Sequence, residues 1–173
     1  MRMRIGEFGI RYDRYNRRYL DFRADDVAND LIRLQRLIPE FKDPRSEEEL
    51  LDRLSLRYIR RADLVTAQDG RGLGQDIGFL FSYSFSDSDT YLWLGGVVPE
   101  HRNNGLMSAM IDFTQIINPK SYMKVKTYSE FVNMRRLLEE EKCFDLLKES
   151  EEKDGRVSME YVARFTHNML LEE

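Results

Sequence analysis

Residues 97–108 read VVPEHRNNGLMS, and this stretch decides how the chain on either side of it folds. The segment before it, 90–94, is aromatic, aliphatic and β-branched, which is typical of a buried strand. After it, we expect a helix from about Arg102 to Ile117, ended by Asn118-Pro119. The apolar residues that recur there at helical spacing are Leu106, Met110, Phe113 and Ile117. The stretch is therefore predicted to join a strand to a helix.

The loop at this junction is polar and holds a single glycine, Gly105. Such a loop points backbone N–H groups outward at the positive end of the helix dipole, which favours an anion. Gly105 also removes a side chain from the first turn, where a phosphate would otherwise clash. Neither the Gly-Lys-Ser/Thr of a phosphate-loop NTPase nor the Gly-x-Gly-x-x-Gly of a dinucleotide site is present. The sequence predicts a bound phosphate, and the alternative is an ordinary turn with a helix-breaking glycine.

The pattern Val-x-Pro-x-x-Arg-x-x-Gly-x-x-Ser between a strand and a helix resembles motif A of the GNAT acetyltransferase superfamily. In that family, backbone amides of the motif hold the pyrophosphate of acetyl-CoA. Arg102, Asn104, Gly105 and Leu106 fit the pattern, whereas Met107 stands where a glycine or alanine is usual. We expect the Met107 side chain to crowd the loop while its backbone amide stays available.

A second, weaker resemblance lies in residues 133–144, where Asn133 begins an apolar helix that is followed by Cys143-Phe144. The family has glycine before this phenylalanine, and often a tyrosine near the helix end that acts as acid toward the CoA thiolate. That tyrosine is absent here. The resemblance implies acetyl-CoA as cofactor, with contacts from Val97, Val98, Arg102, Asn103, Asn104, Gly105, Leu106, Met107, Ser108 and Asn133.

The fold class expected from the element order is mixed α/β: a mostly antiparallel sheet of about seven strands, flanked by about four helices, with a parallel βαβ unit at 90–127. This order is also that of the GNAT fold. The strands are expected at 4–12, 17–22, 63–68, 76–86, 90–98, 122–127, 143–147 and 157–165. Two other helices are expected at 24–38 and at 131–141. A further helix is expected to begin at Ser46, where Ser46 and Glu49 would form a capping box.

Composition limits the function classes. The chain of 173 residues suits one domain, 1–173, and its single cysteine and two histidines predict neither a disulfide nor a metal site. No membrane span or secretory pattern is seen, so we expect a cytoplasmic protein. A net charge of −4 argues against broad nucleic-acid binding. The arginines and tyrosines of 1–18 are interpreted as a solvated strand pair rather than a nucleic-acid surface.

The reaction that the resemblance implies is direct acetyl transfer to an amine. Gly95-Gly96 in mid-strand favours a bulge or a close approach. In the family a bulge here opens a slot for the pantetheine arm and frees an N–H, near Val97 in this chain, to polarise the acetyl carbonyl. Tyr91 stands where many members have a glutamate base, and it is the candidate catalytic residue, as a proton relay, while the alternative is a wall of the pocket. Trp93 is interpreted as core, and the base itself is not identified.

Two function classes remain open. The first is an acetyl-CoA-dependent N-acyltransferase acting on a primary amine, and the second is a non-enzymatic CoA-binding module on the same fold. A nucleic-acid-modifying enzyme is a more distant third. The acceptor is expected to meet the first two helices, their connection at 38–46 and the late hairpin, whose mixed charges do not separate a small amine from a peptide. The sequence leaves a homodimer open.

Overall fold

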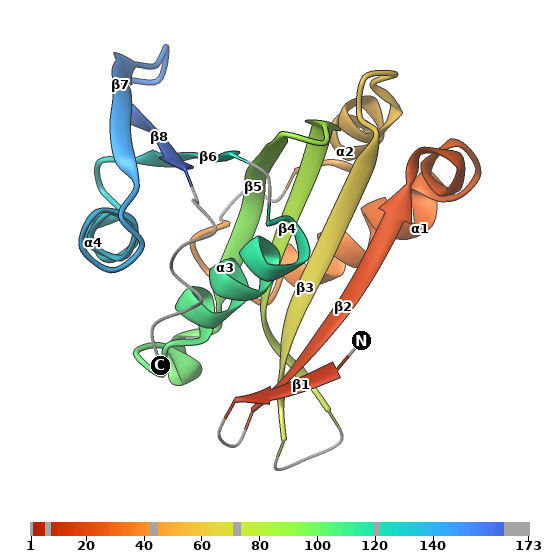
Figure 1. The fold of residues 1–173 in the computed structure, drawn as a ribbon, viewed down its shortest axis with the longest axis horizontal. Coiled ribbons are helices and arrows are strands. Elements are labelled where there is room, and N and C mark those ends of the chain that lie inside the picture. The colour runs from red at the N-terminus through yellow and green to blue at the C-terminus, as the bar shows by residue number, and fades with distance from the viewer. Residues whose placement is uncertain (1, 6–7, 42–44, 71–73, 120–121, 165–173) are drawn as a thin grey trace.

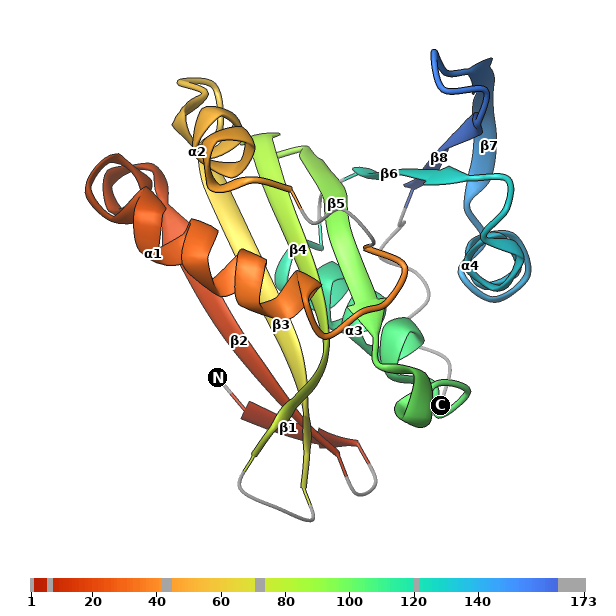
Figure 2. The ribbon, with the colours of Figure 1, turned by 180° about the vertical axis from the view of Figure 1, so that it is seen from behind.

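The structure, a computed structural model, describes residues 2–5, 8–41, 45–70, 74–119 and 122–164, which form one twisted sheet with helices on both faces (Figures 1 and 2). Its eight strands follow the order β1-β2-β3-β4-β5-β6-β8-β7, and only β5 and β6 run parallel. The strands are β1 (Arg2–Ile5), β2 (Phe8–Asn16), β3 (Arg61–Asp69), β4 (Asp76–Ser86), β5 (Asp89–Val97), β6 (Tyr122–Tyr128), β7 (Asp145–Glu151) and β8 (Val157–Arg164). The helices are α1 (Arg17–Gln35), α2 (Glu47–Ser55), α3 (Leu106–Ile117) and α4 (Val132–Arg136). The predicted mixed α/β class is confirmed.

Two apolar cores lie on opposite faces of the sheet. On one face, α1 and α2 cover a core that includes Leu31, Leu50, Phe79 and Phe81. On the other face, α3 and the residues after α4 close a core that includes Leu106, Phe113, Met123, Leu138 and Tyr161. Because both faces are covered, almost every residue of β4 is buried, and the segment 77–81 holds only apolar side chains and a glycine rather than an alternation of apolar and polar residues. No helix in the described part of the chain is long and apolar enough to span a membrane.

The N-terminal segment differs from the prediction. Instead of one strand at 4–12 and a second at 17–22, the chain forms the hairpin β1–β2 and then enters α1 directly. Asn16 caps α1 by accepting a hydrogen bond from the backbone N–H of Tyr19, 2.9 Å away. The helix bends at Arg23, whose φ of −137° and ψ of 26° are not helical. With β1 and β2 the sheet has eight strands, where about seven were expected.

The interpretation of the N-terminal arginines is also partly wrong, because several of them are paired within the fold. Arg11 pairs with Asp13, and Arg17 pairs with Asp21. Arg14 reaches across to Asp63, a carboxylate with no exposed surface. These arginines have carboxylate partners of their own, which weakens the case for a nucleic-acid surface.

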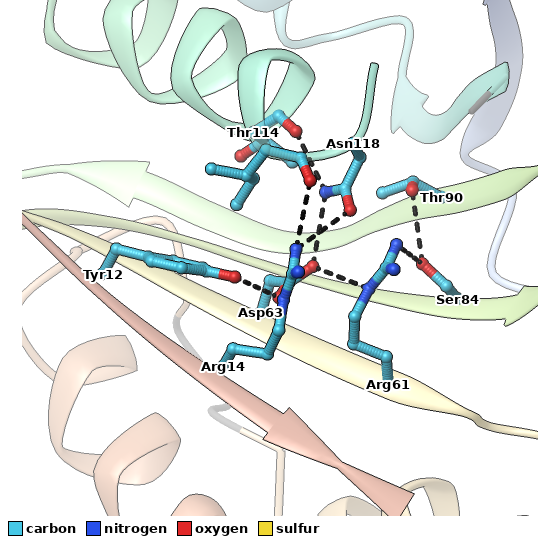
Figure 3. Close-up of polar contacts among 9 residues, drawn as sticks. Tyr12, Arg14, Arg61, Asp63, Ser84, Thr90, Thr114 and Asn118 are labelled. Carbon is cyan, nitrogen blue, oxygen red and sulfur yellow. Dashed lines mark hydrogen bonds and ion pairs between the residues drawn. The ribbon is translucent and has the colours of Figure 1, made fainter. Parts of the chain in front are cut away.

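Asp63 lies at the centre of a buried polar network that joins β2, β3 and the end of α3 (Figure 3). Its carboxylate accepts hydrogen bonds from Arg14 Nε at 2.8 Å, Tyr12 Oη at 2.9 Å and Asn118 Nδ2 at 3.3 Å. Arg61 Nε lies 3.3 Å from the same carboxylate. Burial, and then the adjacent carboxylate, raise the pKa of Tyr12, so its phenol stays protonated and donates. The network holds α3 against the sheet.

Candidate functional site

The most distinctive feature of the sheet is the separation of its one parallel pair. β5 pairs with β6 only from Asp89↔Tyr122 to Leu92↔Val125. Beyond Leu92, β5 continues to Val97 with β4 as its partner, while β6 diverges from β5 and stays paired with β8 (Figure 1). The second half of β5 therefore has a hydrogen-bonding edge that faces away from β4.

Two backbone N–H groups of β5 point outward from this edge. Val98 donates its N–H to Ile77 O on the β4 side, at 2.9 Å. Because N–H groups alternate between the two sides of an antiparallel strand, those of Val97 and Gly95 face the side from which β6 has departed. This direction is the one expected for a carbonyl-polarising N–H near Val97.

The bulge that accompanies the separation is not at Gly95-Gly96. Those two glycines stay in register with Leu80 and Phe79, and the register shifts earlier, leaving Trp93 without an opposite residue on β4. The predicted position of the bulge is therefore wrong. The glycines serve close packing instead: a Cβ on Gly96 would lie 2.9 Å from Ile38, and a Cβ on Gly95 would lie 3.0 Å from Leu80.

The loop after β5 reaches α3 later than predicted. A 3-10 turn at Pro99–His101 follows the strand, and α3 begins at Leu106 rather than near Arg102. Asn103 and Gly105 have φ values of 60° and 69°, in the left-handed region, and these prevent an earlier helix. A Cβ at Gly105 would meet nothing within 4 Å, so the space over this residue is open.

The start of α3 presents unpaired donors. The first helical hydrogen bond runs from Ala109 N to Gly105 O at 2.9 Å, and no side chain caps the helix. The N–H groups of Leu106, Met107 and Ser108 precede that bond, so they point out of the helix end together with the positive end of its dipole. This arrangement has the donors that an anion would need, so the anion site expected from the sequence stays a prediction.

Two polar side chains of the loop hold its shape. Asn104 Nδ2 donates to the carbonyls of His101 and Arg102, both at 3.2 Å. Arg102 Nε donates to Val97 O at 3.0 Å, and its Nη2 contacts Glu40 Oε2 at 2.6 Å. The Arg102 guanidinium keeps the pKa of Glu40 below its usual value. Arg102 is thus oriented by groups on both sides, and its side chain remains 38% exposed.

Met107 does not crowd the loop. It is half-buried, and its Cε lies 3.4 Å from the place where Gly95 would carry a Cβ. The side chain therefore turns inward onto β5, in the space that Gly95 leaves. Val97 and Leu106 are buried, so they can offer a ligand only their backbone.

Asn133 is exposed on the first turn of α4. The helix predicted over 131–141 is α4 followed by a π-helical turn, Leu137–Glu141. Leu138 and Phe144 of this region pack in the same core as α3.

Cys143, which stands where the resembled family has a glycine, has a φ of 53°, in the left-handed region that favours glycine. Lys142 Nζ also pairs with Asp112 of α3 at 2.5 Å.

Tyr91 and Trp93 lie on the opposite face of β5, with the core under α1 and α2. The Tyr91 ring stacks on Tyr83 with centroids 5.3 Å apart. Burial raises the pKa of Tyr91 to about 12, with a further contribution from Tyr83, so Tyr91 is a neutral phenol at ordinary pH. Trp93 is half-buried and contacts arginines as well as core, which the interpretation as core alone did not predict.

Several solved structures share this fold. Ard1 from Thermoplasma volcanium matches with a TM-score of 0.64 and 12% identity, over 91% of this chain and 98% of that one. A GNAT family acetyltransferase from Elizabethkingia anophelis with acetyl-CoA bound matches with a TM-score of 0.56 and 13% identity, over 91% and 98%. An aminoglycoside 6'-N-acetyltransferase complexed with coenzyme A matches with a TM-score of 0.58 and 9% identity, over 88% and 96%.

At these identities the likeness establishes the fold, which is that of GNAT acetyltransferases and confirms the fold expected from the sequence. No protein-family model matches the sequence, and neither does any curated protein.

Proposed function

We propose that this protein is an acetyl-CoA-dependent N-acetyltransferase that moves an acetyl group directly to a primary amine. One observation supports it above the others. The uncapped start of α3 is joined by one loop to the end of β5, a strand that has lost its parallel neighbour, so a helix end suited to a phosphate and an open strand edge belong to one strand-loop-helix unit. Structural neighbours solved with coenzyme A or acetyl-CoA bound have the same fold, which adds support.

In this proposal the α3 start holds the pyrophosphate of the cofactor. The N–H groups of Leu106, Met107 and Ser108 donate to phosphate oxygens, and Arg102 adds a positive charge beside them. The pantetheine arm then lies along the outer edge of β5. There the N–H of Val97 donates to the thioester carbonyl and stabilises the oxyanion that forms on attack.

The chemical step needs a neutral amine. Its nitrogen attacks the acetyl carbonyl, the carbon–sulfur bond breaks, and CoA leaves as a thiolate that accepts a proton from water. The attacking nitrogen loses a proton at the same stage. Tyr91, with its pKa of about 12, does not take that proton as a free base, and we assign it the orientation of the amine or of a water.

Glu160 is a carboxylate that can receive this proton through water. In the sheet register, Tyr91 of β5 lies opposite Lys124 of β6. Two residues further along β6, Lys126 lies opposite Glu160 of β8. Side chains two residues apart on a strand share a face, so Glu160 is exposed on the same face of the sheet as Tyr91. Its charge acts on Tyr91, where it raises the pKa of the phenol.

A CoA-binding module without catalysis is the second candidate. It is favoured by the neutral phenol at Tyr91, the position at which many proteins of the resembled family carry a glutamate base. Two measurements separate the candidates. Thermal unfolding with CoA tests binding, and a gain of about 2.7 kcal/mol is expected at ligand a hundredfold above its dissociation constant. Release of free thiol from acetyl-CoA in the presence of amines tests catalysis.

The outcomes are distinct. A melting temperature unchanged by millimolar acetyl-CoA contradicts both candidates. Stabilisation with amine-dependent thiol release supports the transferase. Stabilisation without release across a broad panel of primary amines supports the module.

A further inference from the structure

A half-buried tryptophan on the α1/α2 face of β5 is flanked by two arginines. The Cζ atoms of Arg45 and Arg53 lie 5.4 Å and 5.5 Å from the centroid of the Trp93 ring. Arg45 precedes the N-cap of α2, and Arg53 lies in the last turn of that helix. Guanidinium groups over an indole are attracted by the electron-rich face of the ring. Trp93 thus fixes two cations on one small surface.

These two cations lack the partners that other arginines of this protein have. Within the described part of the chain, no carboxylate lies within 4.0 Å of either guanidinium, although Arg11, Arg14, Arg17, Arg33 and Arg102 all have one. Two like charges beside one ring repel each other, and an anion that binds there reduces that repulsion and gains charge-assisted hydrogen bonds.

The two arginines lie close to the open edge of β5, where the proposed reaction takes place. Trp93 is the bulged residue of β5, one position beyond the last contact with β6. Tyr83 and Tyr91 extend the aromatic surface beside it, with the Tyr83 ring centroid 5.8 Å from that of Trp93. The arginines thus stand where the strands separate, on the face opposite to α3.

We propose that Arg45 and Arg53 bind a carboxylate of the acceptor, so that the amine acetylated by this protein carries an acidic group. This inference rests on the proposed function, which it deepens by naming a substrate class. A polyamine or aminosugar would bring further positive charge to a surface that already holds two guanidinium groups for which the described residues offer no carboxylate. An aromatic cage for an ammonium group is disfavoured for the same reason, since the arginines already lie over the Trp93 ring.

The same face of the sheet also carries a negative charge that can attract the amino group of such an acceptor. Glu160 lies on the same face across the opening, on β8, and its negative charge favours the ammonium form of the amine before transfer. Carboxylate and amine would then be drawn toward opposite sides of Tyr91 and Trp93, which orients the nitrogen relative to the thioester.

A direct binding test uses the fact that Trp93 is the only tryptophan of the chain, so its fluorescence reports on this surface without any need for turnover. With CoA saturating, we expect phenylalanine to change the emission at concentrations at least about tenfold lower than phenylalanine amide does. Aspartyl-phenylalanine amide and asparaginyl-phenylalanine amide form a second matched pair. It distinguishes an acidic peptide from a free amino acid as the source of the carboxylate. Spermidine serves as the polycation.

Arg45→Gln and Arg53→Gln should abolish the preference for the acidic member of whichever pair shows it. Arg57→Gln is the matched control, because Arg57 is an exposed arginine just beyond α2 and does not contact Trp93; it should leave the preference unchanged. The same ratios are then measured for kcat/KM by thiol release.

A fluorescence response equal within both pairs, or strongest for spermidine, overturns the inference, as does a preference that survives both arginine substitutions. Failure of the proposed function is seen separately, as the absence of thermal stabilisation by CoA or of thiol release with any amine.

Discussion

Arg102 Nη2 and Glu40 Oε2 lie 2.6 Å apart, so the arginine of the loop between β5 and α3 is paired with a carboxylate from the segment that follows α1. The two sites of the proposed reaction thereby share one ion pair: Glu40 belongs to the connection expected to meet the acceptor, and Arg102 to the loop expected to hold the cofactor. Within that connection, residues 42–44 lie outside the described part of the chain, so the role expected for their charges at the acceptor stays a prediction.

Removing the charge of Glu40 should strengthen cofactor binding. Glu40→Gln leaves Arg102 in place through its bond to Val97 O but removes a negative charge near the phosphates, so we expect CoA to bind roughly threefold to tenfold more tightly at low salt. Arg102→Gln should weaken binding by a similar factor or more. Calorimetric titration at two salt concentrations checks both, and weaker CoA binding by Glu40→Gln would show that Glu40 supports the site rather than competes for Arg102.

Gly105 tests the phosphate site itself. Gly105→Glu places a side chain and a negative charge in the open space over the α3 start, and CoA affinity should fall by about 2–4 kcal/mol. Gly155 is a matched control, because it also has a positive φ, of 80°, and open space around it. Gly155→Glu should carry a similar backbone strain and leave the dissociation constant of CoA unchanged. Equal affinities for the two folded variants would make the loop an ordinary turn.

Tyr91→Phe should lower kcat by about tenfold or more while CoA binding is retained, because one orienting hydroxyl is lost. Burial raises the pKa of Tyr91 to about 12, so the phenol is neutral on both sides of pH 7 and does not titrate in the working range. The rise of kcat/KM with pH therefore comes from another group, and its midpoint should be the same in wild type and variant. A midpoint moved by the substitution would assign the titrating group to Tyr91.

Asp63→Asn should destabilise the fold by about 2–4 kcal/mol, because Arg14 and Arg61 would then face a neutral amide in a buried network. Asp13→Asn breaks the half-exposed pair with Arg11 and should change the free energy of unfolding by less than about 1 kcal/mol. Urea unfolding of the two variants gives the comparison. A loss for Asp63→Asn no larger than that for Asp13→Asn would contradict a central role for the network.

Cys143→Gly should stabilise the protein by about 0.5–1 kcal/mol, since glycine relieves a left-handed φ of 53° and loses only part of that gain to its greater unfolded-state entropy. Cys143→Ser, which keeps a Cβ, should show no comparable gain in thermal unfolding. Stabilisation by serine equal to that by glycine would place the effect in the side chain rather than in the backbone.

By itself, the sequence of residues 97–108 was enough to predict a strand, a phosphate-binding loop and a helix, because these depend on local periodicity, a proline and one glycine. The capping box at Ser46 and Glu49 was predicted for the same reason and is present. The start of α3 was predicted too early, because the left-handed conformation of Asn103 does not show in a polar loop sequence.

Contacts between residues of different elements were decided by the tertiary structure alone. The pairing of Glu40 with Arg102, the turning of Met107 onto Gly95, the network around Asp63 and the arginines over Trp93 all join residues from different elements. No spacing rule places such residues together, since their proximity follows from the strand order and from where β6 leaves β5. The loop proposed to bind phosphate is therefore a property of the sequence, whereas the surface proposed to recognise the acceptor is a property of the fold, because Arg45 and Arg53 meet Trp93 only in the folded chain.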